Sequence, residues 1–86
     1  MASILRAMVT GRQIRAARAL LGWTQQALAD RALVAINTVR AIESGRRYPK
    51  PGSLSAVRRA LEKGGIVFLP NETMGEGVHL ARPKAT

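Results

Sequence analysis

The sequence predicts a single, mainly α-helical domain of four helices that ends in a β-hairpin. Three observations support this fold class. In four successive segments, apolar residues recur at the three- and four-residue spacing of a helix that is buried on one side. Capping residues precede three of these segments, and glycines follow three of them. After Gly64 the helical spacing gives way to a continuous apolar run and then to alternation, which is typical of strands.

Two helices are predicted at the start of the domain, over residues 11–21 and 25–32. Thr10 and Thr24 precede them and supply the hydroxyl oxygen that caps a helix N-terminus. Gly22 follows the first helix, where a glycine readily takes the left-handed conformation that ends it. The residues that we expect to face the core are Ile14, Ala17, Leu21, Leu28 and Ala32.

Two further helices follow a short turn over residues 33–35. The third helix covers about 36–44 and stops at Gly45, and a loop over 46–52 contains two prolines. We expect Ser53 to cap the fourth helix, which ends at Gly64. The core-facing residues of these helices are predicted to be Val39, Ile42, Leu54, Val57 and Leu61.

The segment after the fourth helix predicts two strands, over 66–69 and 78–82, joined by a glycine-rich turn over 70–77. A two-stranded hairpin is only marginally stable alone, so it has to pack on the helices or pair with another chain. Both faces of the first strand are apolar, so one face can seal a homodimer. The alternative is that the fourth helix covers one face and the N-terminal arm covers the other. The hairpin residues assigned to this packing or dimer contact are Ile66, Phe68, Val78 and Leu80.

The pattern divides the chain into four parts. Residues 1–9 are expected to form a flexible arm, 10–64 the helical domain, 65–82 the hairpin, and 83–86 a disordered tail.

Charge gives the first indication of function. Fourteen Lys and Arg oppose five Asp and Glu, for a formal net charge of +9, and most of the basic residues are arginine. Such an excess indicates a polyanionic partner, and three aromatic residues are too few to stack along a single strand. Double-stranded DNA is therefore the expected partner. No apolar run is long enough to span a membrane, and cysteine is absent, so we expect a cytoplasmic protein.

Two stretches carry a family resemblance: GWTQQALAD over 22–30 and TVRAIESG over 38–45. They resemble the Cro/cI-like (XRE) helix-turn-helix family, and the similarity extends from about Gly11 to Leu61. The resemblance implies a helical DNA-binding domain whose members are commonly dimeric bacterial repressors. Here the last helix of the family is replaced by the strand-turn-strand after Gly64, as in a subset of small bacterial regulators. We expect a nucleoid-associated protein whose third helix enters the major groove.

Phosphate contacts are expected at the edges of the helix-turn-helix unit. Gln25 matches the family glutamine that binds a DNA phosphate at the start of the second helix, where free backbone amides and the helix dipole also attract anions. Arg46, Arg47 and Lys50 fall in the loop where family members make further phosphate contacts.

Base recognition is assigned to the outward positions of the third helix, Ile36, Asn37, Arg40 and Ala41. Asn37 can bind adenine and Arg40 can bind guanine, whereas the two apolar residues can only contact thymine methyl groups or fill space. Their apolar character also makes this surface a candidate site for a protein partner.

Three further features concern the geometry of the unit. Leu33 stands where the family usually has a left-handed glycine, and Ala35 stands where it usually has a Ser or Thr cap. Arg18 and Glu43 match a family ion pair that connects the first and third helices. Such a partly buried pair fixes geometry more than it stabilises the fold.

The sequence does not predict an enzyme, a metal site or a cofactor. His79 is the single histidine, and in an alternating strand it is expected at the surface or at a dimer edge. The acidic residues are scattered, and the glycines at 75 and 77 lack the strand-then-helix context of a phosphate-binding loop. The alternative function is a protein-interaction module, an antitoxin or anti-activator, that keeps the fold without specific DNA binding.

Overall fold

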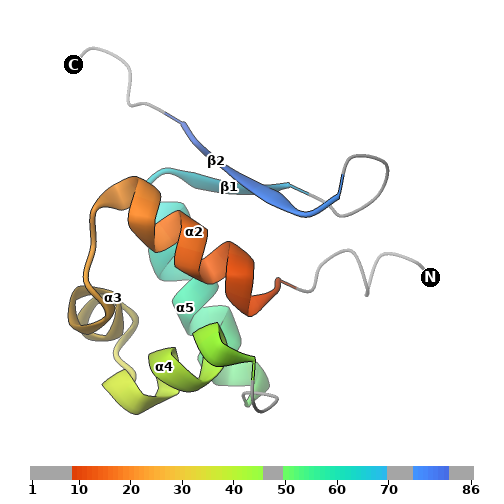
Figure 1. Ribbon diagram of the computed structural model, residues 1–86. Helices are drawn as coiled ribbons and strands as arrows, with labels where there is room; N and C mark the ends of the chain where they lie inside the picture. Colours follow the sequence, from red (N-terminus) through yellow and green to blue (C-terminus); the bar gives the residue numbers. More distant parts are fainter. Residues whose placement is uncertain (1–8, 46–49, 70–74, 82–86) are drawn as a thin grey trace.

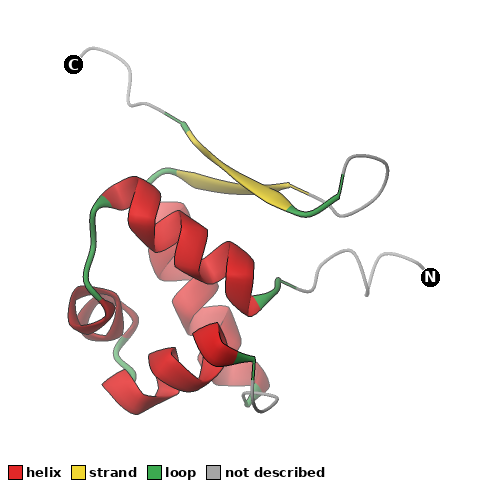
Figure 2. Ribbon diagram, viewed as in Figure 1, coloured by secondary structure: helices red, strands yellow, loops and turns green. Residues whose placement is uncertain are grey.

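The computed structural model describes residues 9–45, 50–69 and 75–81, and within them it confirms the predicted mainly α-helical fold with a terminal hairpin (Figures 1 and 2). The hairpin lies across one side of α2 and α5, and α3 and α4 lie on the other side. The elements in chain order are α2 (Gly11–Leu21), α3 (Gln25–Ala32), α4 (Ile36–Ser44), α5 (Pro51–Lys63), β1 (Ile66–Leu69) and β2 (Gly77–Leu80).

Both predicted threonine caps are present. The Thr10 hydroxyl accepts from the backbone N–H of Gln13 at 3.1 Å, and the Gln13 side-chain oxygen accepts from the Thr10 N–H at 3.0 Å, which completes a capping box. The Thr24 hydroxyl accepts from the Ala27 N–H at 3.0 Å. Gly22 has the left-handed φ of 70° that ends α2.

The start of α5 differs from the prediction. Pro51 and Gly52 are helical and Lys50 is the N-cap residue, so the expectation that Ser53 caps this helix was wrong. Proline suits the first helical position because its ring presets φ and its missing N–H would have no partner there. The Ser53 N–H instead donates to the Lys50 carbonyl at 2.9 Å, as part of the first turn.

The core draws on all four helices and on β1. Its buried apolar residues are Ile14, Ala17, Leu28, Ala29, Ala32, Val39, Ile42, Val57, Ala60, Leu61 and Ile66. Val9, which the prediction placed in the N-terminal arm, packs against this core. Gly11 permits α2 to cross α4, because a Cβ there would lie 2.2 Å from the Ile42 carbonyl oxygen. The expectations for residues 1–8 and 82–86 lie outside the described residues.

The hairpin is antiparallel, with Ile66 opposite Leu80 and Phe68 opposite Val78. Gly77 belongs to β2 and Ala81 does not, so the strand starts one residue earlier than predicted and ends at Leu80. Ile66 is 2% exposed, and Phe68, Val78 and Leu80 pack against the core.

These four residues therefore pack within the protein, which was the alternative to a dimer contact, because the protein's own helices cover the face that carries them. The opposite face carries Val67 and Leu69, which are 46% and 43% exposed, and His79. Only this outward face is open to a second chain within the described part of the hairpin.

Gln13 connects the hairpin to α2 at the end where β1 stops and β2 starts. Its side chain is buried, and its Nε2 donates to the carbonyl of Gly77 at 2.8 Å and to that of Leu69 at 3.3 Å. Arg12 forms an ion pair with Glu76 at the same end. The hydrogen bond from Arg12, and then one from Thr10, lowers the pKa of Glu76, and the same pair raises the pKa of Arg12.

Candidate nucleic-acid interface

The N-terminus of α3 presents free backbone donors. Thr24 caps the Ala27 N–H, whereas the N–H groups of Gln25 and Gln26 have no partner within the described residues. The dipole of the helix adds partial positive charge at this end. The start of α3 therefore has the donors and the potential that suit an anionic oxygen.

Glu43 connects this helix start to α4 and α2. Its side chain is 4% exposed and accepts two hydrogen bonds from Arg18, at 2.7 Å from Nε and 3.1 Å from Nη2. The Gln25 side-chain N–H donates to the same carboxylate at 3.1 Å. One carboxylate therefore holds three helices, and the Gln25 amide keeps one N–H hydrogen beyond this bond.

Two further bonds brace the same junction, and sequence reasoning did not find them. Arg18 Nη1 donates to the Trp23 carbonyl at 2.9 Å, and Arg15 Nη2 donates to the Glu43 carbonyl at 3.2 Å. The hydrogen bond to Glu43 raises the pKa of Arg18. Backbone carbonyls as acceptors leave no mark in a sequence, so only the spacing of the arginines on α2 could have suggested these contacts.

The turn between α3 and α4 keeps its tight geometry despite a non-glycine residue. Leu33 is left-handed, with φ 59° and ψ 43°, and its residue surface is 91% exposed. The Val34 N–H still donates to the Ala29 carbonyl at 3.0 Å, which closes the end of α3. Ala35 occupies the N-cap of α4 without a side-chain hydrogen bond, as its methyl group requires.

The outer face of α4 carries a polar row. Asn37, Arg40 and Ser44 are exposed and follow one another at i, i+3 and i+7, and Arg40 Nη1 donates to Asn37 Oδ1 at 3.3 Å. Of the four predicted base-reading residues, Asn37 and Arg40 thus lie on the outer surface.

Ile36 and Ala41 are half-buried, and Ile36 packs against the core. Ile36 therefore contributes to packing, whereas Ala41, four residues after Asn37, lies on the same side of α4 as the polar row. The assignment of both to base reading stays a prediction. Ser44 was missed, although its position seven residues after Asn37 could have placed it in the same row.

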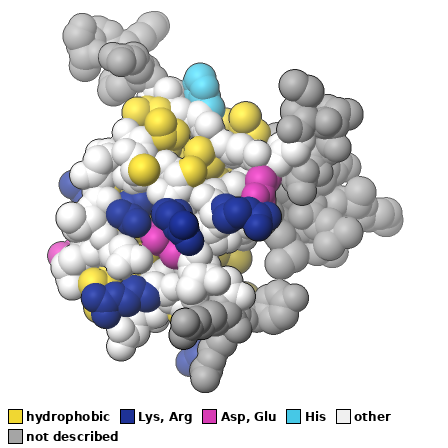
Figure 3. All heavy atoms as spheres, viewed as in Figure 1, with side chains coloured by type: hydrophobic (Ala, Val, Ile, Leu, Met, Phe, Trp, Pro, Cys, Tyr) yellow, Lys and Arg dark blue, Asp and Glu magenta, His cyan; other side chains and the backbone are white. Residues whose placement is uncertain are grey.

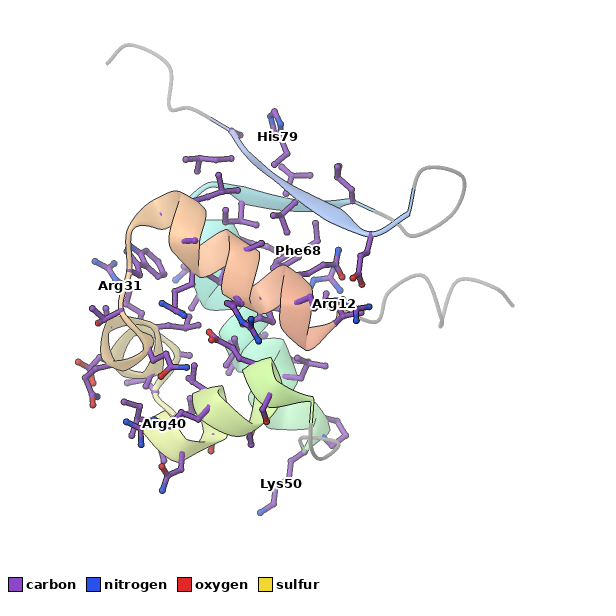
Figure 4. The ribbon with its side chains drawn as sticks, in the orientation of Figure 1. Arg12, Arg31, Arg40, Lys50, Phe68 and His79 are labelled. Carbon is purple, nitrogen blue, oxygen red and sulfur yellow. The ribbon has the colours of Figure 1, made fainter. Side chains whose placement is uncertain are left out.

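Basic groups lie around these helices. Lys50 is exposed at the start of α5, and Figure 4 shows Arg40 and Lys50 at the end of the molecule opposite His79. Figure 3 shows Lys and Arg side chains in a band across the middle of one face, below apolar side chains near the hairpin. The predicted phosphate ligands Arg46 and Arg47 lie outside the described residues.

The matched family agrees with this geometry. The family described as "Helix-turn-helix" matches residues 14–65, which is more than half of the chain. The chain belongs to the Cro/cI-like (XRE) helix-turn-helix family. No curated protein matches the chain.

In this helix-turn-helix protein, α3 and α4 are the two helices of the motif and Leu33 lies in its turn. Membership indicates a DNA-binding regulatory protein whose partner is double-stranded DNA, in a family that is typically not enzymatic.

A metal-ligand cluster and a membrane-spanning helix are both absent from the described part of this helix-turn-helix protein. Within residues 9–45, 50–69 and 75–81, His, Asp and Glu side chains do not gather into a group of three that could hold a metal ion. None of the helices described is long and apolar enough to cross a bilayer.

Proposed function

We propose that this protein is a sequence-specific transcriptional regulator that binds double-stranded DNA with α4 in the major groove. The observation that carries the proposal is the exposed row of Asn37 and Arg40 on α4, beside the uncapped amides at the start of α3. The side chains on α4 suit base edges, and the amides of α3 suit a phosphate. The two sets of groups thus lie on the two helices of one motif.

Phosphate binding at α3 involves groups that are already oriented. The Gln25 side chain is held by Glu43, so its remaining N–H and the two backbone amides need little further ordering. Lys50 at the start of α5 adds a positive charge, and Arg46 and Arg47 precede it in the sequence. These contacts fix the register of the protein on DNA without reading its sequence.

Base recognition falls to Arg40 and Asn37. In the free protein they bond each other, so binding exchanges that bond for bonds to base edges. Arg40 suits the O6 and N7 acceptors of guanine, and Asn37 suits adenine. Ile36 packs against the core and Ala41 offers only a methyl group, so direct readout depends on few polar side chains, and we expect a short or degenerate half-site.

We further propose that the protein acts as a homodimeric repressor in the bacterial cytoplasm, at the nucleoid. The outward hairpin face with Val67 and Leu69 is the surface that supports self-association. A two-fold dimer would place two α4 helices about 34 Å apart, so it would favour an inverted repeat.

The test is selection of bound sequences from a random pool of duplexes. We expect enrichment of an inverted repeat whose half-sites are about one helical turn apart. Asn37→Ala and Arg40→Ala should each relax one base position, whereas Ser55→Ala on the exposed side of α5 should leave the selected motif unchanged. A pool that stays unenriched would contradict the proposal.

The second candidate is a protein-interaction module, and the exposure of Leu33 is the observation that favours it. A large apolar residue that is 91% exposed in a left-handed turn suits a protein contact better than a solvated loop. Under this alternative, duplex binding would be weak at all sequences, and Leu33→Ser would abolish binding of the protein partner.

A further inference from the structure

A cavity of about 230 Å³ lies on the side of the molecule formed by α3 and the C-terminal end of α5. It is lined by Trp23, Arg31, Ala60, Lys63 and Gly64. Trp23 comes from the connection between α2 and α3, and Arg31 comes from the last turn of α3. The cavity is thus built by three segments that the fold brings together.

The cavity lies away from the proposed DNA contact at Lys50. Lys63 is the last residue of α5, and Lys50 precedes its first residue. A helix of this length is about 20 Å long, so the two lysines lie at opposite ends of it. Figure 4 likewise shows Arg31 and Lys50 well apart. A ligand in this cavity would therefore leave Lys50 available to DNA.

The lining is cationic and contains no acid. Within the described residues, neither Arg31 nor Lys63 forms an ion pair. The acids next to them in sequence, Asp30 and Glu62, accept hydrogen bonds from other residues of their own helices. Two positive charges that share a cavity without a carboxylate favour an anionic ligand.

The shape favours a flat ligand. The Arg31 guanidinium lies 4.3 Å from the centre of the Trp23 ring, so two planar groups border the cavity. Gly64 allows the ring edge to lie close to the end of α5, since a Cβ there would lie 3.0 Å from the ring carbon Cη2 and 3.0 Å from Leu21 Cδ1. A closed cavity of about 150 Å³ accepts benzene. This cavity is larger but partly open to solvent, so a ring with a substituent fits with one side solvated.

We propose that this cavity binds a small planar organic anion of the size of a single-ring carboxylate. The guanidinium of Arg31 would bind the carboxylate through its fork of N–H donors, and Lys63 would add a second charge. The ring of the ligand would lie against Trp23. This inference does not rest on DNA binding, so the two proposals can fail separately.

The first experiment titrates the whole protein with benzoate and follows the indole N–H resonance of Trp23 by NMR. The chain has one tryptophan, so this signal has a single origin. We expect saturable shifts with a dissociation constant on the order of 1 mM, as suits a ligand this small. Benzamide, which is neutral and of similar shape, should bind at least about tenfold more weakly, because a charged acceptor bonds the guanidinium more strongly. No saturation at about 20 mM benzoate, or equal binding of benzamide, would overturn the proposal.

Variants locate the site. Arg31→Gln combined with Lys63→Gln should weaken benzoate binding by about tenfold or more. Lys50→Gln combined with Arg59→Gln removes the same charge from exposed positions outside the cavity, so binding should stay within about twofold of the parent. An equal loss in both double variants would show a general charge effect and overturn the proposal.

A third variant tests the cavity without changing charge. Gly64 has φ −78°, which any residue adopts, so Gly64→Ala strains no backbone and instead crowds the Trp23 ring and the Leu21 side chain. Benzoate binding should weaken by about fivefold or more while the far-ultraviolet circular dichroism stays unchanged, because a displaced ring reshapes a packed site. Unaltered binding in this folded variant would contradict the assigned position of the ligand.

Discussion

Arg18 and Glu43 form a two-point ion pair between α2 and α4, and the carboxylate is almost fully buried. The same carboxylate accepts from Gln25, so the pair also sets where the start of α3 lies. The proposed phosphate contact and the stability of the fold therefore depend on one acidic side chain.

Glu43→Ala should destabilise the protein strongly. The substitution leaves the Arg18 guanidinium without its carboxylate partner and Gln25 without an acceptor, at a cost of about 3 kcal/mol. For a domain of this size, this lowers the melting temperature by more than about 10 °C. Glu62→Ala on α5 is the matched control, because its pair with Arg58 is partly solvated and contributes less than about 1 kcal/mol. Equal melting temperatures of the two variants in calorimetry would refute the structural role of Glu43.

Gln13→Ala should loosen the hairpin. It removes donors from the carbonyls of Gly77 and Leu69 and the acceptor of the Thr10 N–H, at a cost of about 2 kcal/mol. Amide hydrogen exchange in β1 and β2 should accelerate more than exchange in α3 and α4. The same substitution at Gln26, an exposed residue of α3, should change stability by less than about 0.5 kcal/mol. If hydrogen exchange accelerated equally in all helices and strands, Gln13 would not hold the hairpin locally.

Leu33→Gly should stabilise the protein by about 0.5–1 kcal/mol. Glycine takes the left-handed φ of 59° without the steric cost that leucine bears there, and little apolar burial is lost because the side chain is exposed. Urea unfolding measures the change. Leu33→Ala keeps the left-handed strain and should leave the midpoint nearly unchanged, so a gain equal to that of glycine would disprove the backbone argument.

Stability should depend on pH through Glu76. Its ordinary pKa is 4.5 and the folded protein lowers it, so the ionised group stabilises the fold above that value. The difference in unfolding free energy between the parent and Glu76→Gln should be full at neutral pH and should vanish as pH falls through the folded pKa. In an Arg12→Gln background this pH dependence should shrink, because Arg12 is the main cause of the shift. If the difference in unfolding free energy between the parent and Glu76→Gln stays constant down to about pH 3, Glu76 is not the source of the pH dependence.

The sequence predicted most of the fold because local signals agreed with one another. Thr10, Thr24, Gly22 and Gly45 bound the helices where expected, and strand β1 matches its apolar run. The start of α5 was missed because Ser53 resembles a cap, whereas the ring of Pro51 already fixes the first turn.

The candidate site was less predictable, because side-chain orientation depends on tertiary packing. Ile36 satisfies the helical spacing of an outer face, yet it is half-buried and packs against the core. The bonds from Gln13 to the hairpin join residues more than fifty positions apart, and nothing local in the sequence indicates them.

The central claim is that the α3–α4 unit binds double-stranded DNA through phosphate contacts. The direct test is the affinity for a labelled duplex, measured by fluorescence anisotropy over a series of salt concentrations. We expect nanomolar binding at about 50 mM salt and a logarithmic slope of about −0.9 for each phosphate contacted. Lys50→Gln should reduce that slope by about 1, whereas Lys63→Gln, at the opposite end of the same helix, should leave it unchanged. Absence of nanomolar binding to every duplex tested at about 50 mM salt would contradict the claim and favour the protein-interaction module.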